Sequence, residues 1–218
     1  SELAPSEITL AEAFKEAGYR TGHIGKWHLG GTGALPTDQG FDLNRGGGEN
    51  GMPHSYFSPY KNVSNLPVGP EGEYLTTRLA DESIAFIEES LKANQPFYLN
   101  LSFYAVHNPM QAPSELVEKY RKKAATLGLD AKEGRFDPGR ERQVWPDTKE
   151  PRMVRIRQDH AIYAAMIESL DTSVGDQMHR VAGAAEGAGA RRDIVGDDPV
   201  TALTLPLCLS VLDDTHRL

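Results

Sequence analysis

The chain has 218 residues and a formal net charge of −8, and 39% of its residues are hydrophobic and 25% charged. A chain of this length and composition can bury a core and usually forms one domain. The negative charge and the lack of a basic run exclude a nucleic-acid surface, and no apolar stretch is long enough to span a bilayer. The single cysteine, Cys208, excludes an internal disulfide and is expected to be a small buried apolar residue.

The first predicted element is a helix over residues 8–17, where apolar residues recur near helical spacing. Ser6 or Thr9 would cap this helix at its start, and Gly18 would end it. A short strand over residues 21–25 follows. A helix that leads directly into a strand favours an α/β domain over a helical bundle.

The strand opens a passage that is dense in chemistry-bearing side chains, since residues 18–30 read GYRTGHIGKWHLG. Gly25 and Gly30 allow the backbone to bend where a residue with a Cβ would resist. Lys26 and His28 are two positions apart, so their side chains can face the same cavity. A cation fixed beside an imidazole suits an anionic substrate.

Residues 43–72 are predicted to be a loop region with aromatic content, because Gly, Asn, Pro and Ser cluster there. Its aromatic and polar side chains would suit a sugar ring, whose apolar face stacks on aromatics while its hydroxyls need polar partners. A connector that orders itself by packing its own aromatics is an equally open interpretation. The residues concerned are Tyr56, Phe57, Tyr60, Asn50, His54 and Asn65.

A long amphipathic helix is predicted over residues 75–91, and a strand buried on both faces over residues 97–104. His107 follows that strand, and α/β folds bind ligands beyond the carboxyl ends of their strands. His107 is therefore a candidate site residue. Residues 124–151 are expected to form a second long connection.

The passage over residues 18–30 resembles the second signature of the type I, formylglycine-dependent sulfatases. In that signature Gly-Tyr-x-Thr runs through three residues into Gly-Lys-Trp-His-Leu-Gly, and every signature position is matched. Further similar segments follow in the family's order, at Pro36 with Gly40-Phe41-Asp42, at residues 96–113 with a His-x-Pro turn, and at residues 163–175. The resemblance implies a three-layer αβα sandwich of the alkaline-phosphatase/sulfatase type, incomplete in this chain, with residues 1–180 as a partial catalytic domain.

The resemblance also implies roles for three residues. Lys26 would contact a sulfate oxygen, His28 would hydrogen-bond the formylglycine hydroxyl and help expel sulfate, and His107 would contact the ester oxygen as general acid. Each has a plainer alternative, as a surface lysine, a core histidine bonded to backbone and a turn cap respectively. His23 is expected to be structural, because no third ligand is spaced to make a zinc site of His23 and His28.

Several parts of the family pattern are absent from the chain. There is no Cys-x-Pro-x-Arg motif to supply the formylglycine nucleophile, and the ligands of the family's calcium ion are missing too, so no metal-binding residue is assigned. We therefore expect that the N-terminal part of the domain is missing. Residues 181–218, rich in Ala and Gly, form a divergent tail that is out of frame or lacks fixed structure, and Asp213-Asp214 within it is given no metal role.

The function that these observations favour is a sulfatase catalytic-domain fragment, whose parent enzyme hydrolyses sulfate esters of carbohydrates or aryl alcohols. One alternative is a non-catalytic remnant or pseudoenzyme that binds sulfated glycans, and another is a related phosphoester or phosphonate hydrolase. The chain alone is expected to be inactive and poorly soluble. Sulfatases are often exported, but the sequence does not decide the compartment of this chain.

Overall fold

The computed structural model describes residues 2–129, 136–144 and 147–187, and Cys208 and Asp213-Asp214 lie outside them. The first elements in chain order are α1 (Leu10–Glu16), β1 (Arg20–Gly25), the 3-10 turn η1 (Pro36–Gln39), β2 (Leu43–Arg45) and α2 (Leu75–Lys92). They are followed by β3 (Phe97–Ser102), α3 (Ser114–Thr126), β4 (Phe136–Val144), β5 (Asp147–Arg155) and α4 (Ala161–Gly187).

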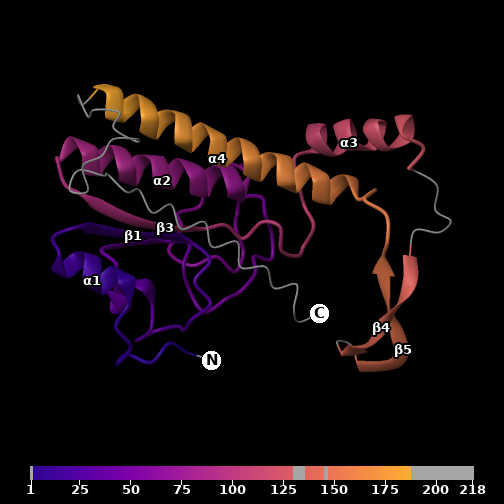
Figure 1. The fold of residues 1–218 in the computed structure, drawn as a ribbon, viewed down its shortest axis with the longest axis horizontal. Coiled ribbons are helices and arrows are strands. Elements are labelled where there is room, and N and C mark those ends of the chain that lie inside the picture. The colour runs from indigo at the N-terminus through magenta and orange to yellow at the C-terminus, as the bar shows by residue number, and fades with distance from the viewer. Residues whose placement is uncertain (1, 130–135, 145–146, 188–218) are drawn as a thin grey trace, which may run out of the picture.

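The centre of the fold is a parallel sheet with strand order β2-β1-β3. Helix α1 covers one face of this sheet, and α2 covers the other with α4 running alongside it (Figure 1). Strands β4 and β5 form a separate antiparallel hairpin that projects beyond the sheet. The predicted αβα layering is therefore confirmed for the described residues.

Helix α1 begins where the sequence predicts a cap. The Glu12 N–H donates to the Thr9 hydroxyl oxygen at 3.2 Å, and the Thr9 N–H donates to the Glu12 carboxylate at 2.7 Å, which makes a capping box. Gly18 follows the helix with a left-handed φ of 86°. The prediction was wrong for Ile8, which lies outside the helix and is 87% exposed.

Strand β1 is the middle strand and is buried almost throughout. At Gly22, an added Cβ would lie 2.8 Å from the Phe86 ring, so glycine lets α2 pack closely on the sheet. At Gly25, φ is 101° and an added Cβ would lie 1.8 Å from the Ser102 carbonyl oxygen. Glycine is thus required where β1 ends beside β3.

The apolar core has one part on each face of the sheet. The larger part lies between the sheet and α2, where Ile24, Leu79 and Leu101 are buried, and Met166 of α4 reaches it. The smaller part lies between the sheet and α1, and contains Ala11, Trp27, Phe41 and Tyr98. Side chains on opposite faces of the same strands fill the two parts, as expected of a sheet covered on both sides.

The C-terminal part of the described chain differs from one sequence-based prediction. Residues 124–151 are not a long connection, because they include the end of α3, all of β4 and part of β5. The expected start of the divergent tail, residue 181, lies within α4, which runs to Gly187. Residues 188–218 lie outside the described residues.

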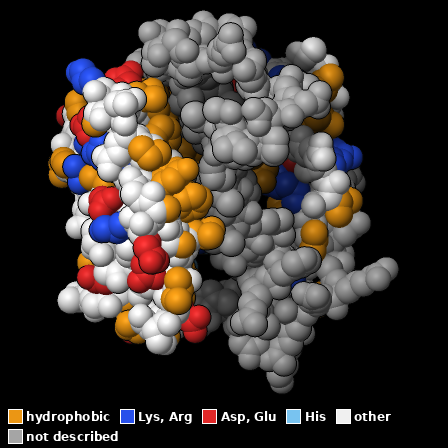
Figure 2. Space-filling model, turned by 60° about the vertical axis from the view of Figure 1, so that its left-hand side comes forward, with side chains coloured by type: hydrophobic (Ala, Val, Ile, Leu, Met, Phe, Trp, Pro, Cys, Tyr) orange, Lys and Arg blue, Asp and Glu red, His pale blue; other side chains and the backbone are white. Residues whose placement is uncertain are grey.

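Some large apolar side chains remain at the surface of the described residues, and Figure 2 shows hydrophobic side chains gathered in a strip on one face. They include Leu29 after β1, Met153 and Val154 on β5, and Tyr163 and Ile167 on α4. Within the described ranges, none of the helices has both the length and the apolar character that crossing a membrane requires.

Candidate active site at the carboxyl edge of the sheet

The candidate site is built where β1 and β3 end side by side. These strands pair in parallel, with Gly25 opposite Ser102, so both carboxyl ends lie at the same edge. The Lys26 N–H donates to the Ser102 carbonyl oxygen at 2.7 Å, which joins the residue after β1 directly to the end of β3. The topology therefore brings Lys26, His28 and the turn that carries His107 to one edge of the sheet.

Lys26 and His28 do not continue the extended strand. Lys26 is half-buried, whereas His28 is exposed and has a left-handed φ of 58°. A residue with a Cβ in this conformation needs support from its surroundings. The expected alternation of strand side chains thus does not apply here, and the position of His28 depends on a neighbouring loop.

That loop is the glycine-rich segment over residues 46–51. The His28 N–H donates to the Gly48 carbonyl oxygen at 2.9 Å. At Gly51, an added Cβ would lie 2.5 Å from two atoms of the His28 imidazole, so only glycine leaves room for the ring. The sequence predicts a loop here but not its contact with His28, although the run GGGENG was a visible signal of close backbone approach.

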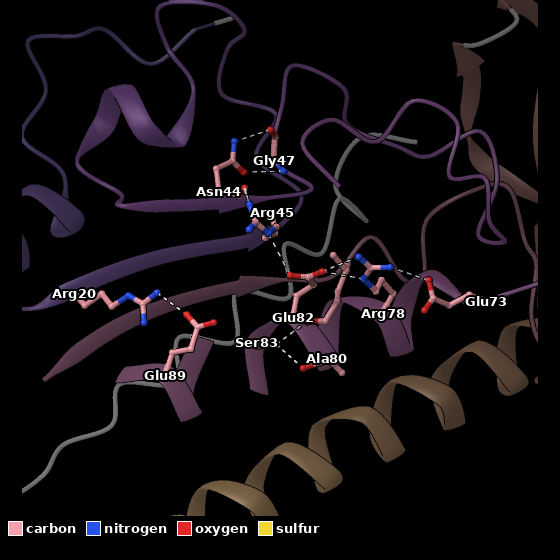
Figure 3. A network of polar contacts seen from close by, with 11 residues as sticks. Arg20, Asn44, Arg45, Gly47, Glu73, Arg78, Ala80, Glu82, Ser83 and Glu89 are labelled. Carbon is pink, nitrogen blue, oxygen red and sulfur yellow. Dashed lines mark hydrogen bonds and ion pairs between the residues drawn. The ribbon is translucent and has the colours of Figure 1, made fainter. Parts of the chain in front are cut away.

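Asn44 and Asn65 hold this loop in place. The Asn44 side chain accepts from the Gly47 N–H at 3.0 Å and donates to the Gly47 carbonyl oxygen at 2.9 Å (Figure 3). The Asn65 amide donates to the same carbonyl at 3.2 Å. Three side-chain hydrogen bonds therefore fix Gly47, the residue before the one whose carbonyl contacts His28.

His107 lies in the turn after β3. Its N–H donates to the Tyr104 carbonyl oxygen at 2.9 Å, and its Nδ1 lies 3.0 Å from the Asn108 carbonyl oxygen. A carbonyl oxygen can only accept, so Nδ1 carries the proton in this contact. Nε2 is then the ring nitrogen that remains for a substrate.

His23 has a structural role, as the sequence indicates. It is fully buried between Trp27 and Phe41, its Nδ1 lies 2.9 Å from the Asn100 amide, and its Nε2 lies 3.2 Å from the Gly25 carbonyl oxygen. The carbonyl requires a proton on Nε2, which leaves Nδ1 to accept from the amide. Burial lowers the pKa of His23 from its ordinary 6.5 to about 4, so the ring is neutral at neutral pH.

The aromatic residues of the loop over residues 43–72 face the core. Tyr56 is fully buried and Tyr60 is 7% exposed, and both belong to the larger core part. Of the two interpretations of this loop, the structure shows the one in which aromatics pack internally. A sugar-stacking surface made of these tyrosines is therefore wrong.

A cavity of about 630 Å³ lies beside β2, and Lys26, His28 and His107 do not line it. Its walls come from η1, β2 and the segment over residues 65–67. The described residues contain no group of three or more His, Cys, Asp or Glu side chains that could hold a metal ion. The part of the chain that the structure describes therefore does not fit a calcium site.

Comparison with known proteins identifies the family of this chain. The family model described as Sulfatase matches residues 1–186. The chain belongs to the sulfatase family. It is 29% identical over 206 residues to an arylsulfatase of Klebsiella aerogenes, an alignment that covers 81% of this chain and 44% of that protein.

Other sulfatases are similar over shorter stretches or at lower identity. The uncharacterized sulfatase YidJ of Escherichia coli K12 is 26% identical over 191 residues, covering 80% of this chain and 38% of that protein. Human arylsulfatase G is 35% identical over 128 residues, covering 56% of this chain and 22% of that protein. The chain thus spans less than half the length of these curated relatives.

Solved sulfatase structures share the fold. The structure of yidJ from Bacteroides fragilis matches 87% of this chain and 42% of that one, with a TM-score of 0.55 and 19% identity. The Ps i-CgsB complex with k-i-k-neocarrahexaose matches 87% of this chain and 39% of that one, with a TM-score of 0.55 and 21% identity. The fold class expected from the signature, the alkaline-phosphatase/sulfatase type, is confirmed.

Proposed function

We propose that this chain carries the sulfate-recognising part of a sulfatase catalytic centre, in which Lys26, His28 and His107 surround a sulfate ester. The observation that supports it is the parallel pairing of β1 and β3, which places all three residues after the carboxyl ends of adjacent strands. Ligands of open α/β sheets bind at this edge. Membership of the sulfatase family supplies the chemical class of the ligand.

Each residue has a task that follows from its chemistry. The Lys26 ammonium is a fixed positive charge that contacts a sulfate oxygen, and its backbone is held to Ser102. In its doubly protonated form His107 keeps the Nδ1 proton on the Asn108 carbonyl oxygen and gives the Nε2 proton to the leaving ester oxygen as the sulfur–oxygen bond breaks, which leaves the neutral Nδ1–H ring. The His28 side chain acts as a hydrogen-bond donor beside the sulfate, and its backbone N–H bonds to the Gly48 carbonyl oxygen.

In the whole catalytic domain, the family's formylglycine would supply the nucleophile of sulfate-ester hydrolysis, and a calcium ion would supply positive charge beside the sulfate. Neither is assigned to a residue of this chain. The proposal for the described residues is therefore restricted to binding the ester and transferring a proton. Hydrolysis of sulfate esters of carbohydrates or aryl alcohols is proposed for the whole catalytic domain.

The test is binding of 4-nitrophenyl sulfate to the 218-residue chain, measured by calorimetry. Lys26→Ala should weaken binding roughly tenfold, the loss expected when one charge-assisted hydrogen bond is removed. Lys92→Ala is the matched control, because Lys92 is an exposed lysine at the end of α2. Equal effects of the two substitutions, or no binding by the unaltered chain, would overturn the proposal.

Two further ligands distinguish the alternatives. 4-Nitrophenyl phosphate has the same aryl group with a phosphate, and tighter binding of that ester would favour a phosphoester hydrolase. The third ligand is k-i-k-neocarrahexaose, the oligosaccharide with which the structural neighbour Ps i-CgsB was solved. Binding of the oligosaccharide that Lys26→Ala leaves unchanged would favour a glycan-binding surface elsewhere on the chain.

A further inference from the structure

We infer that Tyr56, a residue of the loop before α2, is the positioning residue that fixes the His107 turn against the sheet. This inference rests on the proposed function of His107, and it adds a residue that does not touch the substrate. The hydroxyl of Tyr56 reaches the carbonyl oxygens of Tyr104 at 2.7 Å and of His107 at 3.0 Å. These two carbonyls belong to the first and last residues of the turn.

The Tyr56 hydroxyl bonds to both ends of the turn. The His107 N–H already donates to the Tyr104 carbonyl oxygen, so this oxygen accepts from both the turn itself and Tyr56. The hydroxyl has one proton, which the two carbonyls share. The turn can therefore shift away from the sheet only by losing these contacts together.

Tyr56 is itself rigidly held. Its N–H donates to the Gln111 side-chain oxygen at 2.8 Å, and its carbonyl oxygen accepts from the Leu75 N–H at 2.7 Å. Its side chain is fully buried, and its ring stacks on Tyr74 at a centroid distance of 5.9 Å. A side chain fixed at the backbone and at the ring can impose its position on the turn.

The hydroxyl is a donor at every working pH. Burial raises the pKa of Tyr56 far above its ordinary value, so the phenol keeps its proton. A second buried tyrosine extends the connection, because the Tyr104 hydroxyl donates to the Gly46 carbonyl oxygen at 2.8 Å. Gly46 begins the glycine-rich segment that contacts His28, so the supports of the two site histidines meet at Tyr104.

The variant that tests this inference is Tyr56→Phe, which keeps the buried ring and removes only the hydroxyl. Tyr74→Phe is the matched control, because the Tyr74 hydroxyl donates to the Gln111 carbonyl oxygen at 2.9 Å, outside the turn over residues 104–107. Both variants lose one buried hydrogen bond in the same aromatic cluster. Far-UV circular dichroism and dispersed methyl signals verify that each variant is folded.

The first readout is the tautomer of His107 in the full chain without ligand, measured from the ¹³C chemical shifts of its imidazole ring. The unaltered chain and Lys26→Ala serve as references. The His107 signal is assigned by its disappearance in His107→Gln. The unaltered chain and Tyr74→Phe should show the Nδ1–H form that the Asn108 carbonyl selects. Tyr56→Phe should show a mixture of both forms. A folded Tyr56→Phe with the unaltered tautomer would overturn the inference.

The second readout is binding of 4-nitrophenyl sulfate, where Tyr56→Phe should weaken affinity roughly fivefold, the factor that a lost hydrogen bond of ordinary strength gives, and Tyr74→Phe less than twofold. Failure of the unaltered chain to bind would overturn the proposed function. The tautomer of His107 would still test whether Tyr56 positions the turn. If Tyr56→Phe does not fold, the inference is tested on the unaltered chain by NMR. The Tyr56 hydroxyl proton should then exchange slowly and show Overhauser contacts to the turn, and the absence of such a proton would overturn the inference.

Discussion

His23 and His28 are five residues apart, yet their environments are opposite. His23 is enclosed by aromatic rings and has a partner for each ring nitrogen, whereas His28 is exposed and held through its backbone. A buried imidazole with both nitrogens bonded is costly to protonate, because burial disfavours the charged form. The stability of the chain therefore depends on pH through His23.

Acidification is predicted to destabilise the fold through His23. Its pKa is about 4 in the folded chain and 6.5 ordinarily, so the unfolded chain binds the proton more tightly. The contribution is complete above pH 6.5 and is lost as the pH falls toward 4. The free energy of unfolding from urea titrations should decrease by about 2 kcal/mol from pH 7 to pH 5. His23→Gln should remove this part of the slope, and an unchanged slope would contradict the prediction.

Gly25→Ala is predicted to be strongly destabilising. The left-handed φ of 101° and a Cβ only 1.8 Å from the Ser102 carbonyl oxygen would force β1 and β3 apart. We expect a loss of about 3 kcal/mol in the free energy of unfolding. Gly18→Ala is the control, since its φ is also left-handed but nothing lies within 4 Å. Its cost should be about 1 kcal/mol, and equal losses would show that crowding at Ser102 is not the cause.

At the scale of elements, α2 is joined to the preceding loop and to β2 by a charged network (Figure 3). Arg78 lies 3.1 Å from Glu73 and 2.8 Å from Glu82, and Glu82 also pairs with Arg45 at 3.3 Å. The Tyr60 hydroxyl donates to Glu73 as well. These side chains are mostly shielded from solvent, so Arg78 links the loop after β2 to the helix that covers the sheet.

Arg78→Lys is predicted to weaken this link. A lysine keeps the charge but cannot hold both carboxylates with the planar fork of a guanidinium. We expect a loss of about 1.5 kcal/mol in the free energy of unfolding, as for a hydrogen bond to a charged group. Arg121→Lys is the control, because Arg121 is an exposed arginine on α3. That substitution should cost less than about 0.5 kcal/mol, and a comparable cost would mean that the network does not act as a unit.

The elements that the sequence predicts well are those with a local signal. The helix over residues 75–91 has a continuous apolar face, and the structure extends it by one residue to Lys92. The buried strand over residues 97–104 is two residues shorter, because its pairing with β1 ends where Gly25 lies opposite Ser102. The hairpin of β4 and β5 was missed, since its strands are rich in charged residues and contain prolines.

The candidate site was predictable only in part. The signature indicates Lys26 and His28, and the strand before His107 indicates its edge of the sheet. Their supports depend on contacts between distant segments, such as Gly51 against the His28 ring and the Tyr56 hydroxyl on the His107 turn. A local pattern such as GGGENG indicates close backbone approach but not the partner, because the partner depends on how the loop over residues 43–72 folds back on the sheet.

At the scale of the whole molecule, the sheet has two outer strands, and none of the described residues pairs with the outer side of β2 or β3 as a ladder. The Arg20 and Lys26 N–H groups bond to the carbonyls of Pro96 and Ser102, so alternate residues of β3 direct their backbone groups toward β1. The intervening residues direct theirs outward. The outer side of β2 lies beside the cavity of about 630 Å³, where Leu43 is part of the lining.

Open strand edges of this kind predict that the chain associates with itself. We expect the average sedimentation coefficient to rise with protein concentration, because two copies can pair edge to edge. Leu43→Lys places a charge on the β2 edge and should reduce association, since lysine on an edge strand disfavours pairing. Leu43 is half-buried against the larger core part, so circular dichroism must show that this variant is folded. Leu29→Lys is the control, because Leu29 is an exposed apolar residue outside the strands. If Leu29→Lys reduces association and Leu43→Lys does not, the cause is exposed apolar surface, not the open edge.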